Sequence, residues 1–199
     1  MVNDFFGLSL RLLKRLPELF YQCSELETFF SLLLRCACIE NINATKTHRD
    51  FIKELCQRLK DDLSEYQERQ ASGHEHHRES AHEQNIKQKQ AMWAFFIQQG
   101  NNLVLMYITA LLQVPPKEVA SMFVDTLVSL CSTFRDDNVA YRWLEISLEH
   151  VPINVFTVEN KIRLLNTLKA NDTYFRQSAL QVELDLLSKR ARSSAIRST

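Results

Sequence analysis

The chain has 199 residues, of which 45% are hydrophobic and 24% charged, and its 24 basic residues balance its 24 acidic residues. This length supports one sizeable core or a short repeat array, and the balanced charge gives no overall attraction for nucleic acid or an anionic membrane. With three glycines and four prolines, the sequence favours long helices over sheet folds with glycine-rich turns.

The five cysteines show neither an even count nor a Cys-x-x-Cys pair. Their apolar neighbours favour reduced thiols inside an intracellular protein. Charged residues interrupt the apolar stripe at the amino end, unlike a secretory signal. The longest clean apolar run, 103–112, is shorter than a membrane span. We therefore expect a soluble protein.

The first pair of predicted helices occupies residues 2–40. Apolar residues recur on one face of 2–16, and Pro17 ends that helix. After a connector over 18–23, a capping box of Ser24 and Glu27 begins a second helix that runs to about residue 40.

The second pair is longer. A helix over 49–68, with Thr47 and Asp50 as its cap, precedes a polar stretch over 67–84 and a return helix over 85–112. Because glycine lowers helix propensity, Gly100 predicts a break or bend near 98–102.

Two further pairs follow. A helix over 117–134 begins after Pro116, and its partner spans 139–150 and ends before Pro152. This partner is too short to be stable alone and must pack on its neighbours. The last pair spans 158–170 and 173–190, and 191–199 is predicted to be a flexible tail. The apolar stripe predicted for the 139–150 helix consists of Val139, Trp143, Ile146 and Leu148, with N-cap candidates Asp136, Asp137 and Asn138 before it.

The pairs begin near residues 2, 48, 117 and 158. With 67–84 treated as a polar insertion, their spacing is typical of HEAT or armadillo repeats of roughly 40–47 residues. The sequence therefore predicts an all-α fold, a short α-solenoid of about four HEAT-like hairpins over 2–40, 48–112, 116–150 and 158–190. Each hairpin would bury its apolar face against its neighbours.

Four segments carry a family resemblance: VNDFFGLSLRLLKRLP (2–17), LLLRCACI (32–39), HRDFIKEL (48–55) and, above all, YRWLEISLEHVP (141–152). In sequence and order they resemble the carboxy-terminal region of importin-β-family nuclear import receptors, especially those that import Arg/Ser-rich (SR) splicing factors. The resemblance implies a non-enzymatic protein that shuttles between cytoplasm and nucleus and binds protein cargo. It implies no cofactor, no direct binding of nucleic acid and no membrane.

Two features of that family have no match here: the amino-terminal arch that holds most of the Ran-GTP site, and the arginine-rich helix used against phosphorylated Arg-Ser tails. The resemblance thus implies the end portion of a longer receptor, in which Ran-GTP binds only through amino-terminal repeats missing here. The first hairpin would then expose an apolar flank, which predicts self-association through 2–16.

In the family, the second helix of a pair lines the concave surface where cargo docks. The resemblance therefore implies a mixed-charge cargo surface at the residues that lie off the apolar stripe of 139–150. The alternative is that these residues form a solvent-exposed face with no binding role. Trp143 is either a binding hot spot or, as we expect, a core residue. The implied cargo residues are Tyr141, Arg142, Glu145 and Glu149.

A histidine-rich segment is the one cluster with ligands that suit zinc or nickel. The metalloprotease motif HExxH is absent, because Arg78 occupies the position of its second histidine. We expect a solvated loop and no metal site. The segment contains His74, His76, His77 and His82 with Glu75, Glu79 and Glu83.

A basic run near the carboxyl end either contacts phosphate or an acidic partner, or is a frayed tail. No catalytic constellation or phosphate-binding glycine loop is recognisable. Two alternatives to a transport receptor stay open: a free-standing helical adaptor, and a metal-dependent helical-bundle enzyme that uses the histidine-rich segment. The basic run comprises Lys189, Arg190, Arg192 and Arg197 with Ser193, Ser194 and Ser198.

Overall fold

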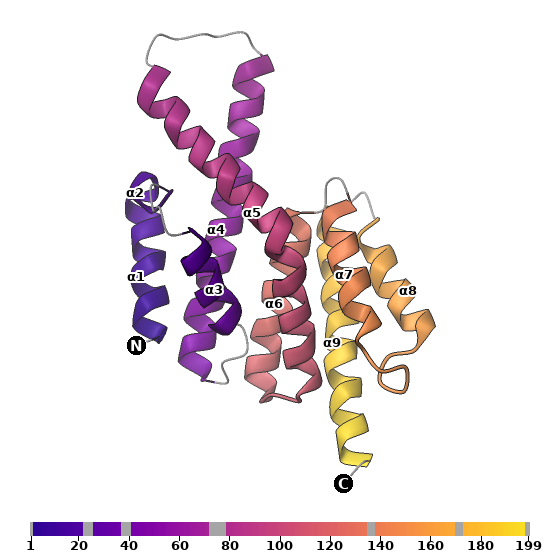
Figure 1. Cartoon of the computed structure of the whole chain (residues 1–199). Helices are drawn as coiled ribbons and strands as arrows, with labels where there is room; N and C mark the ends of the chain where they lie inside the picture. Colours follow the sequence, from indigo (N-terminus) through magenta and orange to yellow (C-terminus); the bar gives the residue numbers. More distant parts are fainter. Residues whose placement is uncertain are drawn as a thin grey trace.

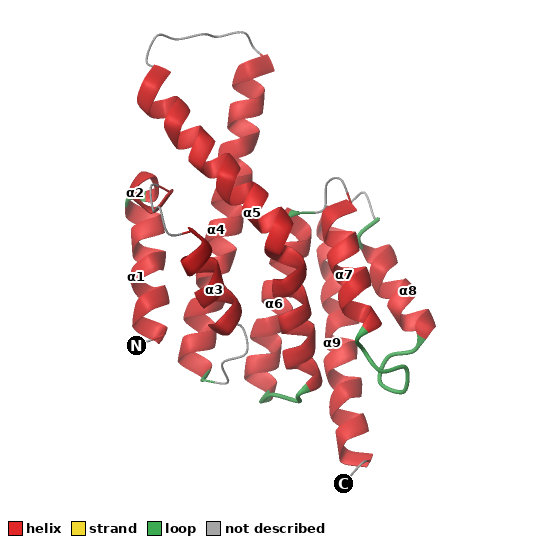
Figure 2. Cartoon of the chain, in the orientation of Figure 1, coloured by secondary structure: helices red, strands yellow, loops and turns green. Residues whose placement is uncertain are grey.

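The computed structural model describes residues 2–21, 26–36, 41–71, 79–134, 138–169 and 173–197. Across these ranges the chain forms helices and no strand (Figure 2), which confirms the predicted all-α fold. The helices are α1 (Val2–Arg15), α2 (Pro17–Tyr21), α3 (Leu26–Cys36), α4 (Ile42–Ala71), α5 (Glu79–Leu112), α6 (Lys117–Thr133), α7 (Val139–Glu149), α8 (Val158–Thr167) and α9 (Thr173–Arg197).

The helices stack in two rows. One row contains α1, α4, α6 and α9, each packed on the next, and the other contains α3, α5, α7 and α8. Figure 1 shows the chain progressing from α1 at one end of the molecule to α8 and α9 at the other. Buried apolar side chains form one continuous cluster along the stack. The fold is therefore solenoid-like, because each pair of helices buries its apolar faces against adjacent pairs.

The last pair departs from simple repetition. In the earlier pairs the first helix lies in the row of α1, whereas α8 packs beside α7 and α9 beside α6. The connector explains this exchange. Pro152 follows the end of α7, its carbonyl accepts hydrogen bonds from the amides of Val155 and Phe156, and Val151 and Phe156 are buried. This anchored turn sends the chain back alongside α7, in the same row.

The predicted start of α4 was wrong. Helix α4 begins at Ile42, and the side chain of Asn41 caps it by accepting a hydrogen bond from the amide of Ala44 at 3.0 Å. Thr47, the predicted cap, lies inside the helix and donates to the carbonyl of Asn43 at 2.9 Å. The Asn41 cap therefore adds about two helical turns.

Most of the predicted polar insertion over 67–84 is also helix. Helix α4 continues to Ala71 and α5 begins at Glu79, and Figure 1 shows these two ends projecting beyond the other helices. Between them, 72–78 lies outside the described residues. Helix formation here needs no apolar face, since polar residues such as Glu, Gln and Lys have good intrinsic helix propensity.

Two further boundaries differ from prediction, and one prediction is untested. Part of the connector predicted over 18–23 is helical, because Pro17 begins the short α2. Helix α9 continues to Arg197 through the predicted tail, where Ala191 is buried and Arg192 donates to the carbonyl of Pro115 at 2.7 Å. The predicted Ser24–Glu27 capping box lies outside the residues whose side chains are described.

Helix α5 continues through Gly100, so the predicted break is absent, and Figure 1 shows that α5 bends part way along its length. A Cβ atom on Gly100 would overlap carbon atoms of the Trp143 indole ring, so the glycine lets α7 approach the α5 backbone closely. Trp143 is only 4% exposed, which confirms its predicted place in the core. Its ring lies 5.2 Å from that of Phe134, and Phe134 lies 4.3 Å from Trp93, centroid to centroid. This aromatic cluster joins α5, α6 and α7.

A second cluster of rings holds the other end of the stack. Phe51 of α4 lies within 5.8 Å of Phe6, Phe20 and Phe29, between ring centroids. His48, one turn before Phe51, packs on Phe6 at 4.6 Å, and its Nδ1 lies 3.1 Å from the hydroxyl of Tyr107 on α5. Burial lowers the pKa of His48 from 6.5 to about 4, and the main chain of Leu33 acts weakly in the opposite direction.

Replacing Gly100 with alanine should destabilise the protein by about 1–3 kcal/mol, because the added methyl group forces the indole out of place. Gly7→Ala is the matched control: its Cβ would lie 3.8 Å from the Thr47 methyl group, an ordinary contact. The control should gain up to about 1 kcal/mol from helix propensity. Urea unfolding measures both effects. In a Trp143→Ala background the Gly100→Ala penalty should vanish, and an equal penalty there would contradict this contact.

The buried His48 predicts acid sensitivity. The unfolded chain binds a proton at this residue near pH 6.5 but the folded chain only near pH 4, so stability decreases as the pH falls through this window. The loss should approach about 3 kcal/mol. Urea midpoints measured from about pH 7 to about pH 4 should show a shallower slope for His48→Gln than for the unchanged chain. Parallel slopes would show that His48 is not the titrating group.

Candidate protein-binding surface

Helix α7 buries one face and exposes the other. Its buried residues are Ala140, Trp143, Leu144, Ser147 and Leu148, and the Ser147 hydroxyl donates to the Trp143 carbonyl at 2.6 Å. The buried stripe therefore includes a serine whose hydrogen bond satisfies its own polar group.

Two sequence-based details of α7 were wrong or untested. Ile146, predicted in the buried stripe, is 40% exposed, since Leu144 and Ser147 occupy the core-facing positions. Asn138 precedes the helix with a left-handed φ of 60° and forms no side-chain cap. The other predicted caps, Asp136 and Asp137, lie outside the described residues.

The four predicted cargo residues share the outer face of α7. Arg142, Glu145 and Glu149 are exposed, and Tyr141 is half-buried, with the Lys169 ammonium 5.1 Å from its ring centroid. Helical spacing places the four side chains on one side, beside the exposed Ile146. The structure thus brings these residues together as a mixed-charge surface, and their binding of cargo stays a prediction.

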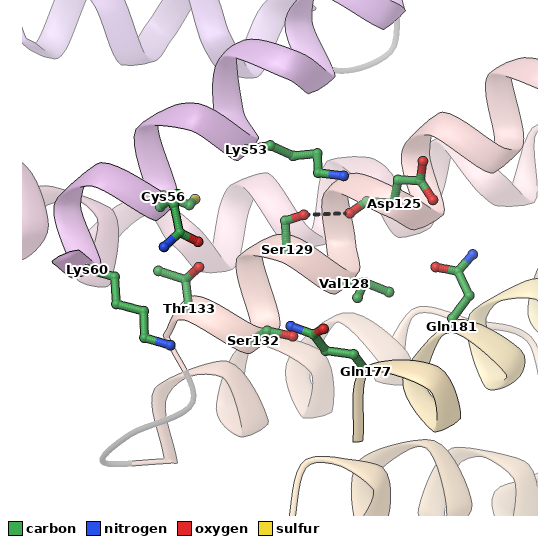
Figure 3. Close-up of a pocket in the computed structure, with 11 residues that line it drawn as sticks. Lys53, Cys56, Lys60, Asp125, Val128, Ser129, Ser132, Thr133, Gln177 and Gln181 are labelled. Atoms are coloured by element: carbon green, nitrogen blue, oxygen red, sulfur yellow. Dashed lines mark hydrogen bonds between the residues drawn. The ribbon is translucent and has the colours of Figure 1, made fainter. Parts of the chain in front are cut away.

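A polar groove that the sequence did not reveal lies on the row of α4, α6 and α9. It has a volume of about 300 Å³. Figure 3 shows Lys53 and Lys60 extending from α4, with side chains of α6 and α9 across from them. Its residues come from three helices far apart in sequence, so no local pattern announces it. The polar side chains that line it include Lys53, Gln57, Lys60, Ser129, Ser132, Gln177 and Gln181.

The charged residues of this groove differ in whether they already form an ion pair. Asp125, at one end, lies 3.4 Å from the guanidinium of Arg49, whereas Lys53 and Lys60 form no ion pair within the described part of the chain. The Ser129 hydroxyl donates to the main-chain carbonyl of Asp125 at 2.9 Å. The buried Ser132 hydroxyl finds no hydrogen-bond partner among the described residues. The groove therefore offers two cations and polar side chains to a ligand.

Helix α1 and Leu16, the residue that follows it, expose apolar side chains. The inner face of α1 buries Phe6 and Leu13, while Phe5, Leu8 and Leu16 are exposed. An exposed apolar stripe of this kind is typical of an interaction surface. The apolar flank expected for the first hairpin is therefore present, and self-association through it stays a prediction.

Two of the cysteines lie deep in the structure. Burial raises the pKa of Cys56 and of Cys131 to about 12, so both thiols stay protonated at neutral pH and are poor nucleophiles. Cys23 and Cys38 lie outside the described residues.

The side chains of the histidine-rich segment, His74 to Glu83, lie outside the described part of the structure. Among the side chains that are described, no group of three or more His, Cys, Asp or Glu residues is placed to hold a metal ion. A search of the described helices finds none that is both long and apolar enough to cross a membrane.

Comparison with protein-family models gives no match for this chain, and a search of curated proteins finds no sequence of significant similarity. The resemblance to nuclear import receptors thus rests on the four segments quoted above, and what it implies for function is a proposal.

Proposed function

We propose that this chain is a protein-binding segment of a nuclear transport receptor of the importin-β family. It would contribute to the binding and nuclear import of Arg/Ser-rich (SR) protein cargo and would move between cytoplasm and nucleus with the receptor. The observation that carries this proposal is the exposed mixed-charge face of α7, because it lies in the segment with the most specific resemblance, YRWLEISLEHVP.

The chemistry of this face suits an Arg/Ser-rich ligand. Glu145 and Glu149 are exposed and one helical turn apart, so their carboxylates can pair with arginine side chains of the cargo. Arg142 lies on the same side and can pair with a phosphorylated serine. The buried Trp143 fixes the orientation of α7 and hence of these charges.

Affinity at such a surface comes from many modest polar contacts with a few stronger anchors. Salt should weaken it, because the contacts are exposed and their charges are screened. In the proposed receptor, Ran-GTP would bind only through amino-terminal repeats that this sequence lacks.

The alternative function is a free-standing helical adaptor unrelated to nuclear transport. One observation favours it: the exchanged helices of the last pair depart from uniform repetition. An adaptor would bind its partners without a requirement for phosphorylated Arg-Ser sequences.

A binding experiment with an immobilised, phosphorylated Arg/Ser-rich protein tests the proposal. The triple variant Arg142→Ala, Glu145→Gln, Glu149→Gln should bind about tenfold more weakly, since three exposed charge contacts of about 0.5 kcal/mol each amount to that factor. The matched control makes the same kinds of change at Arg11, Glu18 and Glu118, which are exposed on other helices.

The control should bind like the unchanged chain. Equal binding by the triple variant would contradict the assignment of cargo binding to α7. Equal binding of the dephosphorylated protein, or of one without Arg-Ser sequences, would favour the adaptor.

A further inference from the structure

A second hollow lies at the carboxyl end of α9. Its volume is about 500 Å³, and it forms between the last turns of α9 and the connector that follows α7. The residues that line it carry two positive charges and no negative charge: Asn154, Val155, Arg190, Ser193, Ser194 and Arg197.

The two arginines of the hollow differ from other arginines of the last helix pair in their interactions. Arg163 forms an ion pair with Glu183 at 2.6 Å, and Arg192 donates to the Pro115 carbonyl at 2.7 Å. In contrast, Arg190 and Arg197 form no ion pair or hydrogen bond with the described part of the chain. Their guanidinium groups are therefore available to donate hydrogen bonds to acceptor atoms of a ligand.

The donors of the hollow are spaced along the helix. Arg190 and Arg197 are seven residues apart, so they lie on the same side of α9 with Cα atoms about 10 Å apart. The Ser193 hydroxyl donates to the Lys189 carbonyl at 3.1 Å, so its proton is already used within the helix. The donors for a ligand are therefore the two guanidinium groups, with the Asn154 amide at the edge.

We propose that this hollow binds an acidic peptide segment of a partner protein through two carboxylates, one for each arginine. Carboxylates accept paired hydrogen bonds from a guanidinium group. Two separate carboxylates also match the two separated guanidinium groups better than one phosphate does. A single phosphate would have to draw the two guanidinium groups together, and their positive charges repel each other. Val155 supplies an apolar wall for the stem of a peptide side chain.

The spacing defines the peptide further. In an extended polyproline II segment, residues three apart lie on the same side and are separated by about 9 Å. A Glu-x-x-Glu sequence in this conformation therefore matches the distance between Arg190 and Arg197. This hollow shares no residue with the outer face of α7 and takes an acidic ligand, whereas the cargo proposed for α7 carries both charges. This inference and the proposed function can therefore fail independently.

Fluorescence anisotropy with labelled peptides tests this inference on the full chain. A peptide with Glu-Pro-Pro-Glu at its centre should bind at least about tenfold more tightly than its Gln-Pro-Pro-Gln counterpart. The double variant Arg190→Ala, Arg197→Ala should lose this preference. Arg190→Lys, Arg197→Lys should weaken binding several-fold, because lysine cannot form the paired hydrogen bonds.

Lys189→Ala is the matched control, since Lys189 is an exposed cation on the same helix that does not line the hollow. It should bind the glutamate peptide like the unchanged chain, and circular dichroism should show equal helicity in all variants. Equal binding of the two peptides, or an equal loss in Lys189→Ala, would overturn the proposal. So would a preference for a peptide with a single phosphoserine over the glutamate peptide.

Discussion

The contact between Trp143 and the α5 backbone at Gly100 is the constraint on which the second half of the structure depends. The indole occupies the space that a side chain at position 100 would fill, so α5 and α7 approach closely. Helix α7 has only 11 residues and is too short to persist without such packing. By fixing α7, this contact also fixes the exposed charges on its outer face and the start of the turn that leads into α8.

The same dependence on neighbours recurs along the stack and determines which surfaces remain open. At the other end, His48 and Phe51 of α4 join rings from α1, α2, α3 and α5. Because most of the packing joins adjacent helix pairs, with one further contact between α5 and α9, the stack leaves long outer faces open. Its binding features therefore lie on the outer faces: the charges of α7, the groove over α4, α6 and α9, and the hollow beside α9. This arrangement suits recognition of extended protein segments along the stack.

The presence of most helices followed from local patterns in the sequence, because apolar periodicity and proline positions act over a few residues. Asn41 was missed as a cap although the residue type allows it, since Thr47 offered a competing start. Helix formation at both ends of the polar stretch depends on propensity without an apolar face, which periodicity does not detect. The role of Gly100 and the groove beside Lys53 and Lys60 arise between distant segments, and one sequence alone does not reveal such contacts. The common exposed face of the charged residues of α7 could be predicted, since helical spacing within one helix determines it.

Hydrogen exchange of a Trp143→Ala variant most directly tests the central claim, that stability passes mainly between neighbouring helix pairs along the stack. Removing the indole should cost roughly 3–5 kcal/mol. If the account is right, amides of α7, α8 and α9 lose protection together, while those of α1 and the part of α4 around His48 keep theirs. A uniform loss of protection across all helices would show a single cooperative core and would contradict the stacked arrangement.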